Sequence, residues 1–165
     1  MSSKEQAKTA PAGASEPRGA LPAWEDLPDI DLYMDQVVSL MTRYLGPVAE
    51  DGGKALTASM VNNYVKTGLV PPPAKKRYAR EHLAYLAIVC SLKAVLPLSG
   101  IRELLERELS GQSIEQFYGE FRMLDEAVTK EARKAHGKAD APVLRASLRA
   151  RAERELAITE LRLAQ

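Results

Sequence analysis

Apolar residues recur at helical spacing along most of the chain, and these stripes predict its first elements. The first stripe consists of Met34, Val37, Val38, Met41 and Leu45. We expect Asp31 to cap the start of this helix, because its carboxylate can accept a bond from a free backbone N–H of the first turn. Gly46 and Pro47 should end the helix, and the rest of residues 46–55 then forms a loop.

A short second helix is predicted over about residues 57–67, between a capping Thr57 and a terminating Gly68. Its apolar side carries Met60, Val61, Tyr64 and Val65. The opposite side carries Ser59, Asn62, Asn63 and Lys66. This polar face has no acidic residue, whereas a solvated helix face usually mixes Glu with Lys. It therefore stands apart from an ordinary surface helix.

Further helices are expected after an extended connector that runs from the triple proline at 71–73 to Tyr78. The third helix, about residues 80–95, is apolar on nearly every side and should be buried by its neighbours. The later stripes are Leu98, Ile101, Leu105 and Leu109, then Ile114, Phe117, Phe121, Leu124 and Val128, then Leu144, Leu148, Ala152 and Leu156. We see no strand pattern beyond a short β-wing, so the predicted fold class is all-α.

The 165 residues divide into three parts. Residues 1–23 are rich in Ala, Ser, Gly, Pro and Lys without periodicity, which predicts a disordered tail. Residues 24–109 hold the first four helices and should form one domain. Residues 110–165 are predicted as a helical C-terminal region, with a turn near 137–142 that permits a helical hairpin.

The net charge of +1 hides a segregation of charges along the chain. The stretch before Lys54 is acidic. Between residues 54 and 80, by contrast, every charge is positive. These charges are Lys54, Lys66, Lys75, Lys76, Arg77 and Arg80. A basic stretch inside a nearly neutral protein indicates a local anionic partner.

Other chemistry is sparse in this sequence. Cys90 lies among apolar residues, which favours a buried structural thiol over a reactive or metal-sensing one. His82 and His136 are far apart and lack a second ligand at metal spacing, so we expect no metal and no cofactor. No Ser-His-Asp, Cys-His, paired-carboxylate or phosphate-loop pattern appears, so we expect no enzyme. The absence of a long apolar run and of a secretory signal predicts a cytoplasmic protein away from membranes.

One continuous run, SMVNNYVKTGLVPPPAKKRYAREHLAYLAIVCSLKAVLPLSGIRELL, resembles the DNA-binding half of the MerR family. In that family a recognition helix ends in Tyr, Gly-Leu and Pro, a basic wing ends in Arg-Tyr, and two helices follow. The matching positions are Tyr64, Gly68, Leu69 and Pro71, then Arg77 and Tyr78, then Leu83, Leu86, Leu98, Ile101, Leu104 and Leu105. Together with PDIDLYMDQVVSL upstream, the run also resembles an uncharacterised bacterial family, domain of unknown function 1836, described as MerR-like.

The resemblance has departures. MerR proteins usually place an Arg on the DNA face and a second Tyr beside the first, where this chain has Asn62 and Asn63. The turn at residues 46–55 is longer than the family's tight turn. The C-terminal metal-sensing cysteines of the family are absent. The departures concern the docking angle and the base-reading residues more than the general DNA-binding role.

The resemblance and the residues together predict a DNA-binding transcriptional regulator with a MerR-like winged helix-turn-helix. Asn pairs bidentately with adenine in the major groove and Ser contacts several bases or phosphates, so the polar face of the helix at 57–67 should read bases. The basic wing at 71–78 should hold the phosphate backbone of double-stranded DNA. The expected contacts are Ser59, Asn62, Asn63, Lys66, Lys75, Lys76, Arg77 and Arg80. We expect structural roles for Tyr64, Gly68 and Tyr78.

Two alternatives concern partners. Phe117, Phe121 and Leu124 lie on a stripe that either packs inside one chain or pairs two chains, as the C-terminal helix of MerR proteins does. We expect a homodimer, because helix-turn-helix proteins usually bind as two-fold dimers. A protein-interaction adaptor that keeps the winged-helix scaffold without binding DNA is the second functional hypothesis. The sequence does not identify an effector.

Overall fold

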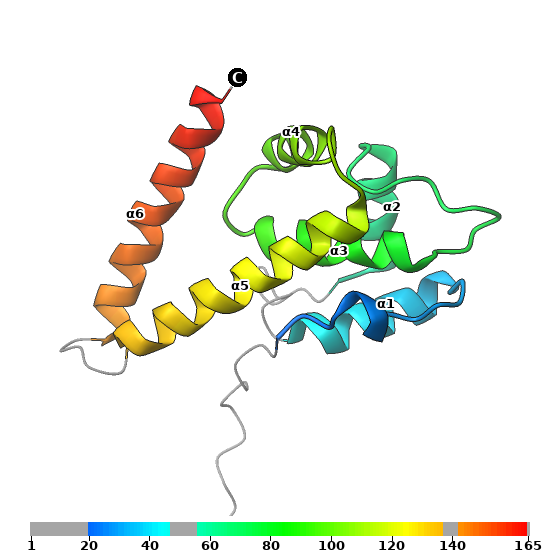
Figure 1. The fold of residues 1–165 in the computed structure, drawn as a ribbon, viewed down its shortest axis with the longest axis horizontal. Coiled ribbons are helices and arrows are strands. Elements are labelled where there is room, and N and C mark those ends of the chain that lie inside the picture. Colours follow the sequence, from blue (N-terminus) through cyan, green and yellow to red (C-terminus); the bar gives the residue numbers. More distant parts are fainter. Residues whose placement is uncertain (1–19, 47–55, 137–141, 165) are drawn as a thin grey trace, which may run out of the picture.

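The computed structural model describes residues 20–46, 56–136 and 142–164, and its regular elements are helical throughout these ranges (Figure 1). After a 3-10 turn at Trp24–Asp26, the α-helices are α1 (Met34–Leu45), α2 (Ala58–Lys66), α3 (Arg80–Leu92), α4 (Leu98–Glu108), α5 (Ile114–His136) and α6 (Pro142–Leu163). The all-α prediction is confirmed. No helix within the described ranges is long and apolar enough to cross a membrane. The predicted loop beyond Gly46, the turn at 137–141 and the first nineteen residues of the predicted tail lie outside these ranges.

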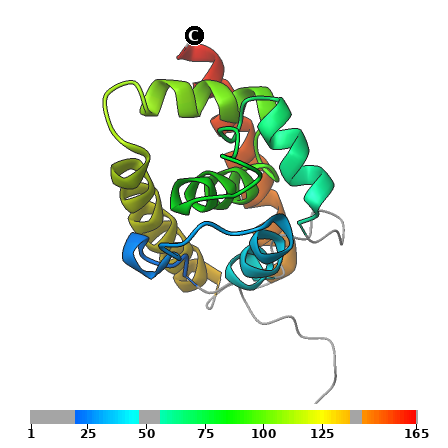
Figure 2. The same cartoon turned by 90° about the vertical axis from the view of Figure 1, so that its right-hand side faces the viewer.

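Helix α3 lies at the centre of the domain and packs against α1, α4 and α5 (Figures 1 and 2). Its sequence explains this position, because apolar residues occur on all its sides and each side needs a neighbour to exclude water. The buried residues of α3 are Leu83, Ala84, Leu86, Ala87, Ile88, Val89 and Cys90. The helix ends at Leu92 and a turn covers residues 93–95, so it is one turn shorter than predicted.

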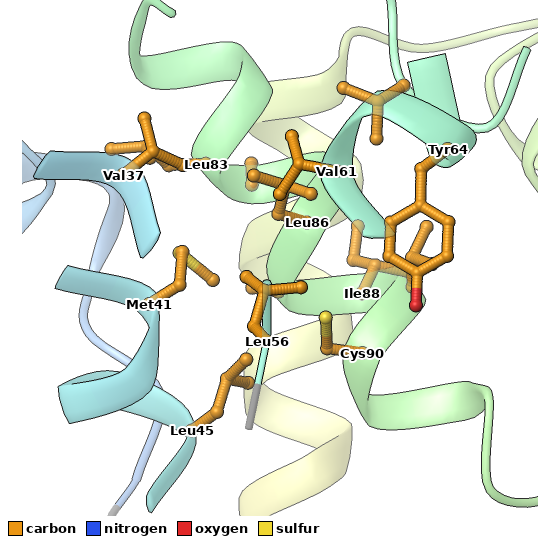
Figure 3. Close-up of a cluster of buried hydrophobic side chains, with 14 of the residues drawn as sticks. Val37, Met41, Leu45, Leu56, Val61, Tyr64, Leu83, Leu86, Ile88 and Cys90 are labelled. Carbon is orange, nitrogen blue, oxygen red and sulfur yellow. The ribbon is translucent and has the colours of Figure 1, made fainter. Parts of the chain in front are cut away.

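The buried faces of α1 and α2 meet α3 in one core, which Figure 3 shows in close-up. Val37, Met41 and Leu45 come from α1, while Val61 and Tyr64 come from α2. All of them belong to the predicted apolar stripes, and none is more than 3 % exposed. The helical periodicity therefore identified the interior sides of both helices.

The sequence predicted the N-cap residue of α2 correctly but not that of α1. Thr57 caps α2 as predicted, because its side-chain Oγ1 accepts a hydrogen bond of 3.2 Å from the backbone N–H of Met60. The prediction that Asp31 caps α1 is wrong. Tyr33 is the N-cap residue there, and its backbone N–H donates to Oε1 of Gln36 at 2.9 Å. The helix starts later because the backbone of Leu32 is used in a β-bridge.

The N-terminal segment packs against α5, which corrects both predicted domain boundaries. Leu21 is only 2 % exposed, so the predicted tail at 1–23 extends too far into the folded part. Tyr118 of α5 is fully buried, and its hydroxyl donates a 2.9 Å hydrogen bond to the carbonyl oxygen of Pro22. The ring of Trp24 lies 6.2 Å from that of Tyr118. The folded domain thus includes the start of α5 and does not end at residue 109.

Helices α5 and α6 leave much apolar surface uncovered. Phe117 is 8 % exposed and Phe121 is half-buried against the core, so the first two residues of the predicted dimer seam pack inside their own chain. Leu124 on the same stripe is 64 % exposed. The other strongly exposed apolar side chains of this region are Met123, Val128, Val143, Leu144, Leu148, Leu156 and Leu163. The stripe therefore changes from core to surface along α5.

Cys90 is a free, buried cysteine. Burial raises the pKa of its thiol to about 11, and nearby Lys93 only partly opposes this effect. A thiol that stays protonated at neutral pH is a poor nucleophile and a poor metal ligand. The structure thus favours the structural interpretation of Cys90.

The bond between Tyr118 and Pro22 gives a direct test of how the N-terminal segment is held. Tyr118→Phe keeps the ring and removes only the hydroxyl, so unfolding free energy should fall by about 1 kcal/mol. Tyr85→Phe is the control, because Tyr85 also packs against the core, half-buried, but its hydroxyl makes no hydrogen bond that the structure shows among the described residues. Urea unfolding should separate the two variants. Equal stability of both would show that the Tyr118 hydroxyl contributes nothing.

Candidate nucleic-acid interface

Helix α2 turns its polar side chains to solvent. Ser59, Asn62, Asn63 and Lys66 are all exposed. Tyr64 on the opposite side is 3 % exposed, so it lies on the buried side of the helix as predicted. The predicted separation of the two faces is correct. What the polar face binds stays a prediction.

Gly68 ends the helix in the left-handed conformation, with a φ of +75°. The chain then reverses over the last turn, and the backbone N–H groups of Leu69 and Val70 both donate to the carbonyl oxygen of Tyr64, at 2.9 and 3.2 Å. Leu69 and Val70 are buried, so this reversal is fixed by packing as well as by hydrogen bonds. Gly68 thus has the left-handed conformation that the sequence predicted.

The basic loop, defined as residues 71–78, carries a tight β-turn at its tip. The backbone N–H of Arg77 donates to the carbonyl oxygen of Ala74 at 2.8 Å, and the two residues form an antiparallel bridge. Lys75 and Lys76 occupy the two central positions, with φ values of 50° and 62°. Positive φ at both central positions is typical of a type I′ turn, which usually takes Asn and Gly. The predicted β-wing is thus reduced to a single turn.

The base of the basic loop is tied to the segment before α1. Leu32 and Tyr78 exchange two backbone hydrogen bonds of 2.9 Å. The Tyr78 side chain is 4 % exposed and meets the His82 ring edge-on at 5.5 Å. Burial raises the pKa of Tyr78, so its phenol remains neutral. Tyr78 therefore has the structural position expected of it.

Arg77 is held by a residue that the sequence did not single out. Its Nη2 donates a 2.9 Å hydrogen bond to the hydroxyl of Tyr33, and its guanidinium carbon lies 4.5 Å from the centre of the Tyr33 ring. Both side chains are exposed. Because 44 positions separate them, no local pattern could have revealed the pair.

The Arg80 side chain packs against the N-terminal segment of the domain. Its Nη2 forms an ion pair with Asp29 at 3.4 Å, and its guanidinium lies 5.7 Å from the Trp24 ring centre. Only 21 % of its side chain is exposed. We therefore leave Arg80 out of the candidate interface, although its charge belongs to the basic stretch.

His82 caps the start of α3. Its Nδ1 accepts a 2.9 Å hydrogen bond from the backbone N–H of Ala79. A nitrogen used in this way does not coordinate a metal. Within the described ranges, no group of three or more His, Cys, Asp and Glu residues is placed to hold a metal ion. The side chain of His136 lies outside the described residues.

Helix α2 and the basic loop belong to the same side of the domain, at the right of Figure 1 and facing the viewer in Figure 2. The residues that remain in the candidate interface are Ser59, Asn62, Asn63, Lys66, Lys75, Lys76 and Arg77. Their charge is purely positive. The arrangement suits a partner that carries negative charge and offers hydrogen-bonding groups to amides.

Comparison with known families covers the same part of the chain. The family described as Domain of unknown function (DUF1836) matches residues 22–121. The chain belongs to this family. No curated protein and no solved structure matches the chain at a significant level. The DUF1836 region runs from the N-terminal segment to Phe121, so it contains the candidate interface and leaves α6 outside.

The conformation of Gly68 predicts opposite effects for two glycine substitutions. A Cβ at Gly68 would meet no atom within 4 Å, so Gly68→Ala should cause no steric clash. It should lower the unfolding free energy by about 1–2 kcal/mol, because a residue with a Cβ is less stable than glycine in the left-handed conformation. Gly119, inside α5, also has open space around it. Gly119→Ala should stabilise the protein by roughly 0.5–1 kcal/mol. Thermal melting compares the two, and a stabilising Gly68→Ala would contradict the assigned conformation.

Proposed function

We propose that this protein is a sequence-specific DNA-binding regulator with a MerR-like arrangement, in which α2 enters the major groove and the basic loop contacts the phosphate backbone. The observation that carries the proposal is the acid-free, amide-rich face of α2 on the same side of the domain as the basic loop. Asn side chains suit the paired donor and acceptor of adenine in the major groove. Lysines suit phosphates, which bind cations without regard to sequence.

The turn at Lys75 and Lys76 supports this assignment. Each non-glycine residue at positive φ costs of order 1–3 kcal/mol, and such strain is found mainly where function requires it. Here the strained turn places two lysines side by side at the exposed tip of a loop. The backbone hydrogen bonds between Leu32 and Tyr78 hold the base of the loop against the domain.

The proposal is of a binding protein and includes no catalytic role, no cofactor and no metal. A protein-interaction adaptor built on the same scaffold is the second hypothesis, and the two differ in their response to salt. Binding to duplex DNA releases counterions from the phosphates, so affinity must fall steeply with salt concentration. An adaptor would show no salt-dependent affinity for duplex DNA. Titration of a fluorescent duplex at several salt concentrations decides between them.

Removing the two lysines of the turn should weaken binding to all duplexes alike. Lys75→Gln/Lys76→Gln is expected to reduce the slope of log affinity against log salt by about 0.9 for each lost phosphate contact. The control is Lys130→Gln/Lys134→Gln on α5, which removes equal charge from exposed positions away from the basic loop. If the turn variant keeps the wild-type slope, the basic loop does not contact phosphate.

Asn62 and Asn63 should determine sequence preference more than total affinity. Because Asn carries no charge, Asn62→Ala or Asn63→Ala should leave the salt slope unchanged. A lost bidentate contact should cost about 1–3 kcal/mol of discrimination at one base pair of each half-site. The measurement is a specificity profile over randomised duplexes at one salt concentration. Profiles identical to wild type for both variants would make the adaptor the better hypothesis.

A further inference from the structure

The segment before α1 runs side by side with the end of the basic loop. Leu32 and Tyr78 exchange both of their backbone hydrogen bonds, so Tyr33 and Arg77 are the next residues opposite each other in this short antiparallel pairing. Successive side chains of an extended backbone point to opposite faces. Because Leu32 and Tyr78 are buried, the backbone directs Tyr33 and Arg77 to solvent, and both are exposed.

The Tyr33 side chain holds Arg77 without neutralising its charge. The guanidinium carbon of Arg77 lies 4.5 Å from the centre of the Tyr33 ring, and its Nη2 donates a 2.9 Å hydrogen bond to the Tyr33 hydroxyl. Among the described residues, no carboxylate forms an ion pair with Arg77, although Asp31 and Asp35 flank Tyr33 in the sequence. Arg77 is therefore fixed in direction and keeps its full positive charge.

The Tyr33 hydroxyl can donate a hydrogen bond while it accepts one, because a phenol does both. Its oxygen accepts from Arg77, and the described ranges show no acceptor for its own proton. The planar guanidinium of Arg77 likewise keeps N–H donors beyond the one that Tyr33 takes up. Two neighbouring side chains thus offer O–H and N–H donors beside one positive charge.

We infer that Tyr33 and Arg77 form a single phosphate-binding site, in which the guanidinium pairs with the phosphate and the Tyr33 hydroxyl donates to an oxygen of the same group. Phosphate oxygens take strong hydrogen bonds from arginine and also accept from tyrosine hydroxyls. An arginine that is already held in direction loses less side-chain freedom on binding than a mobile one. The inference rests on the proposed function for the source of the phosphate, which is the backbone of duplex DNA.

The charges around the pair determine from which side a phosphate approaches. The two lysines of the turn precede Arg77 in the basic loop, whereas Asp31 and Asp35 lie on either side of Tyr33, and all four side chains are exposed. Within a Debye length the lysines attract an anion and the aspartates repel it. A phosphate is therefore favoured on the side of the turn, where the site continues the positive surface of the lysines.

Titration of a fluorescent duplex at several salt concentrations tests this site in the full chain. Tyr33→Phe keeps the ring over Arg77 and should lower affinity roughly three- to tenfold, as expected for one lost hydrogen bond. The slope of log affinity against log salt should not change, because no charge is lost. Tyr44→Phe near the other end of α1 is the matched control, since the described residues show no hydrogen bond of its hydroxyl, and it should bind as wild type does.

A double-mutant cycle shows whether the two residues hold the same phosphate. Arg77→Gln should reduce the salt slope by about 0.9. In the Arg77→Gln background, Tyr33→Phe should change affinity by less than about twofold, because groups that share one ligand are not additive. Equal losses from Tyr33→Phe with and without Arg77 would show two independent contacts and overturn the inference.

Pyrophosphate tests the same site when no duplex binds. In NMR spectra of the full chain, the Nε–H signal of Arg77 should shift to saturation with pyrophosphate, and Tyr33→Phe should weaken this binding at least about threefold. A wild type that binds pyrophosphate in this way but no duplex would support the site and remove the proposed function. Duplex binding that Tyr33→Phe leaves intact would do the reverse. A wild type that binds neither duplex nor pyrophosphate would overturn both.

Discussion

The burial of α3 is the constraint on which the rest of the structure depends. A helix that is apolar on nearly every side cannot lie on a surface, because each exposed side would forfeit the free energy of excluding water. Neighbours must therefore surround it, and α1, α4 and α5 pack against it. The core around α3 also takes in Val61 and Tyr64, so the orientation of α2 is fixed by its buried side. The polar side of α2 is then directed outward as a consequence.

The same packing controls the basic loop. Tyr78, the last residue of the loop, is buried in the core just before α3 begins, and its backbone pairs with Leu32 just before α1 begins. Both ends of the loop are thus anchored, since Leu69 and Val70 before it are buried as well. Strain at Lys75 and Lys76 can persist because the fixed ends of the loop leave the turn few other conformations. A rigid domain therefore presents a strained, positively charged turn.

Acidic and basic residues that are separated along the chain come together in the fold. The acidic segment before α1 lies against the base of the basic loop, where Asp29 pairs with Arg80 and Tyr33 holds Arg77. These contacts remove Arg80 from the candidate interface and fix the direction of Arg77. The lysines at the tip of the turn keep their exposure. Contacts with the segment before α1 thus leave the lysines of the turn, but not Arg80, available to an anionic partner.

The sequence alone determined the helices, their buried sides and the cap at Thr57, because these depend on the periodicity of apolar residues and on bonds between residues three or four apart. It also determined the left-handed Gly68 and the polar face of α2. Long-range contacts decided the rest. Leu32 pairs with Tyr78, which shifted the start of α1; Tyr118 binds Pro22, which extended the domain at both ends; and Asp29 engages Arg80. The partners in each case are far apart in sequence, and only the folded chain brings their atoms within bonding distance.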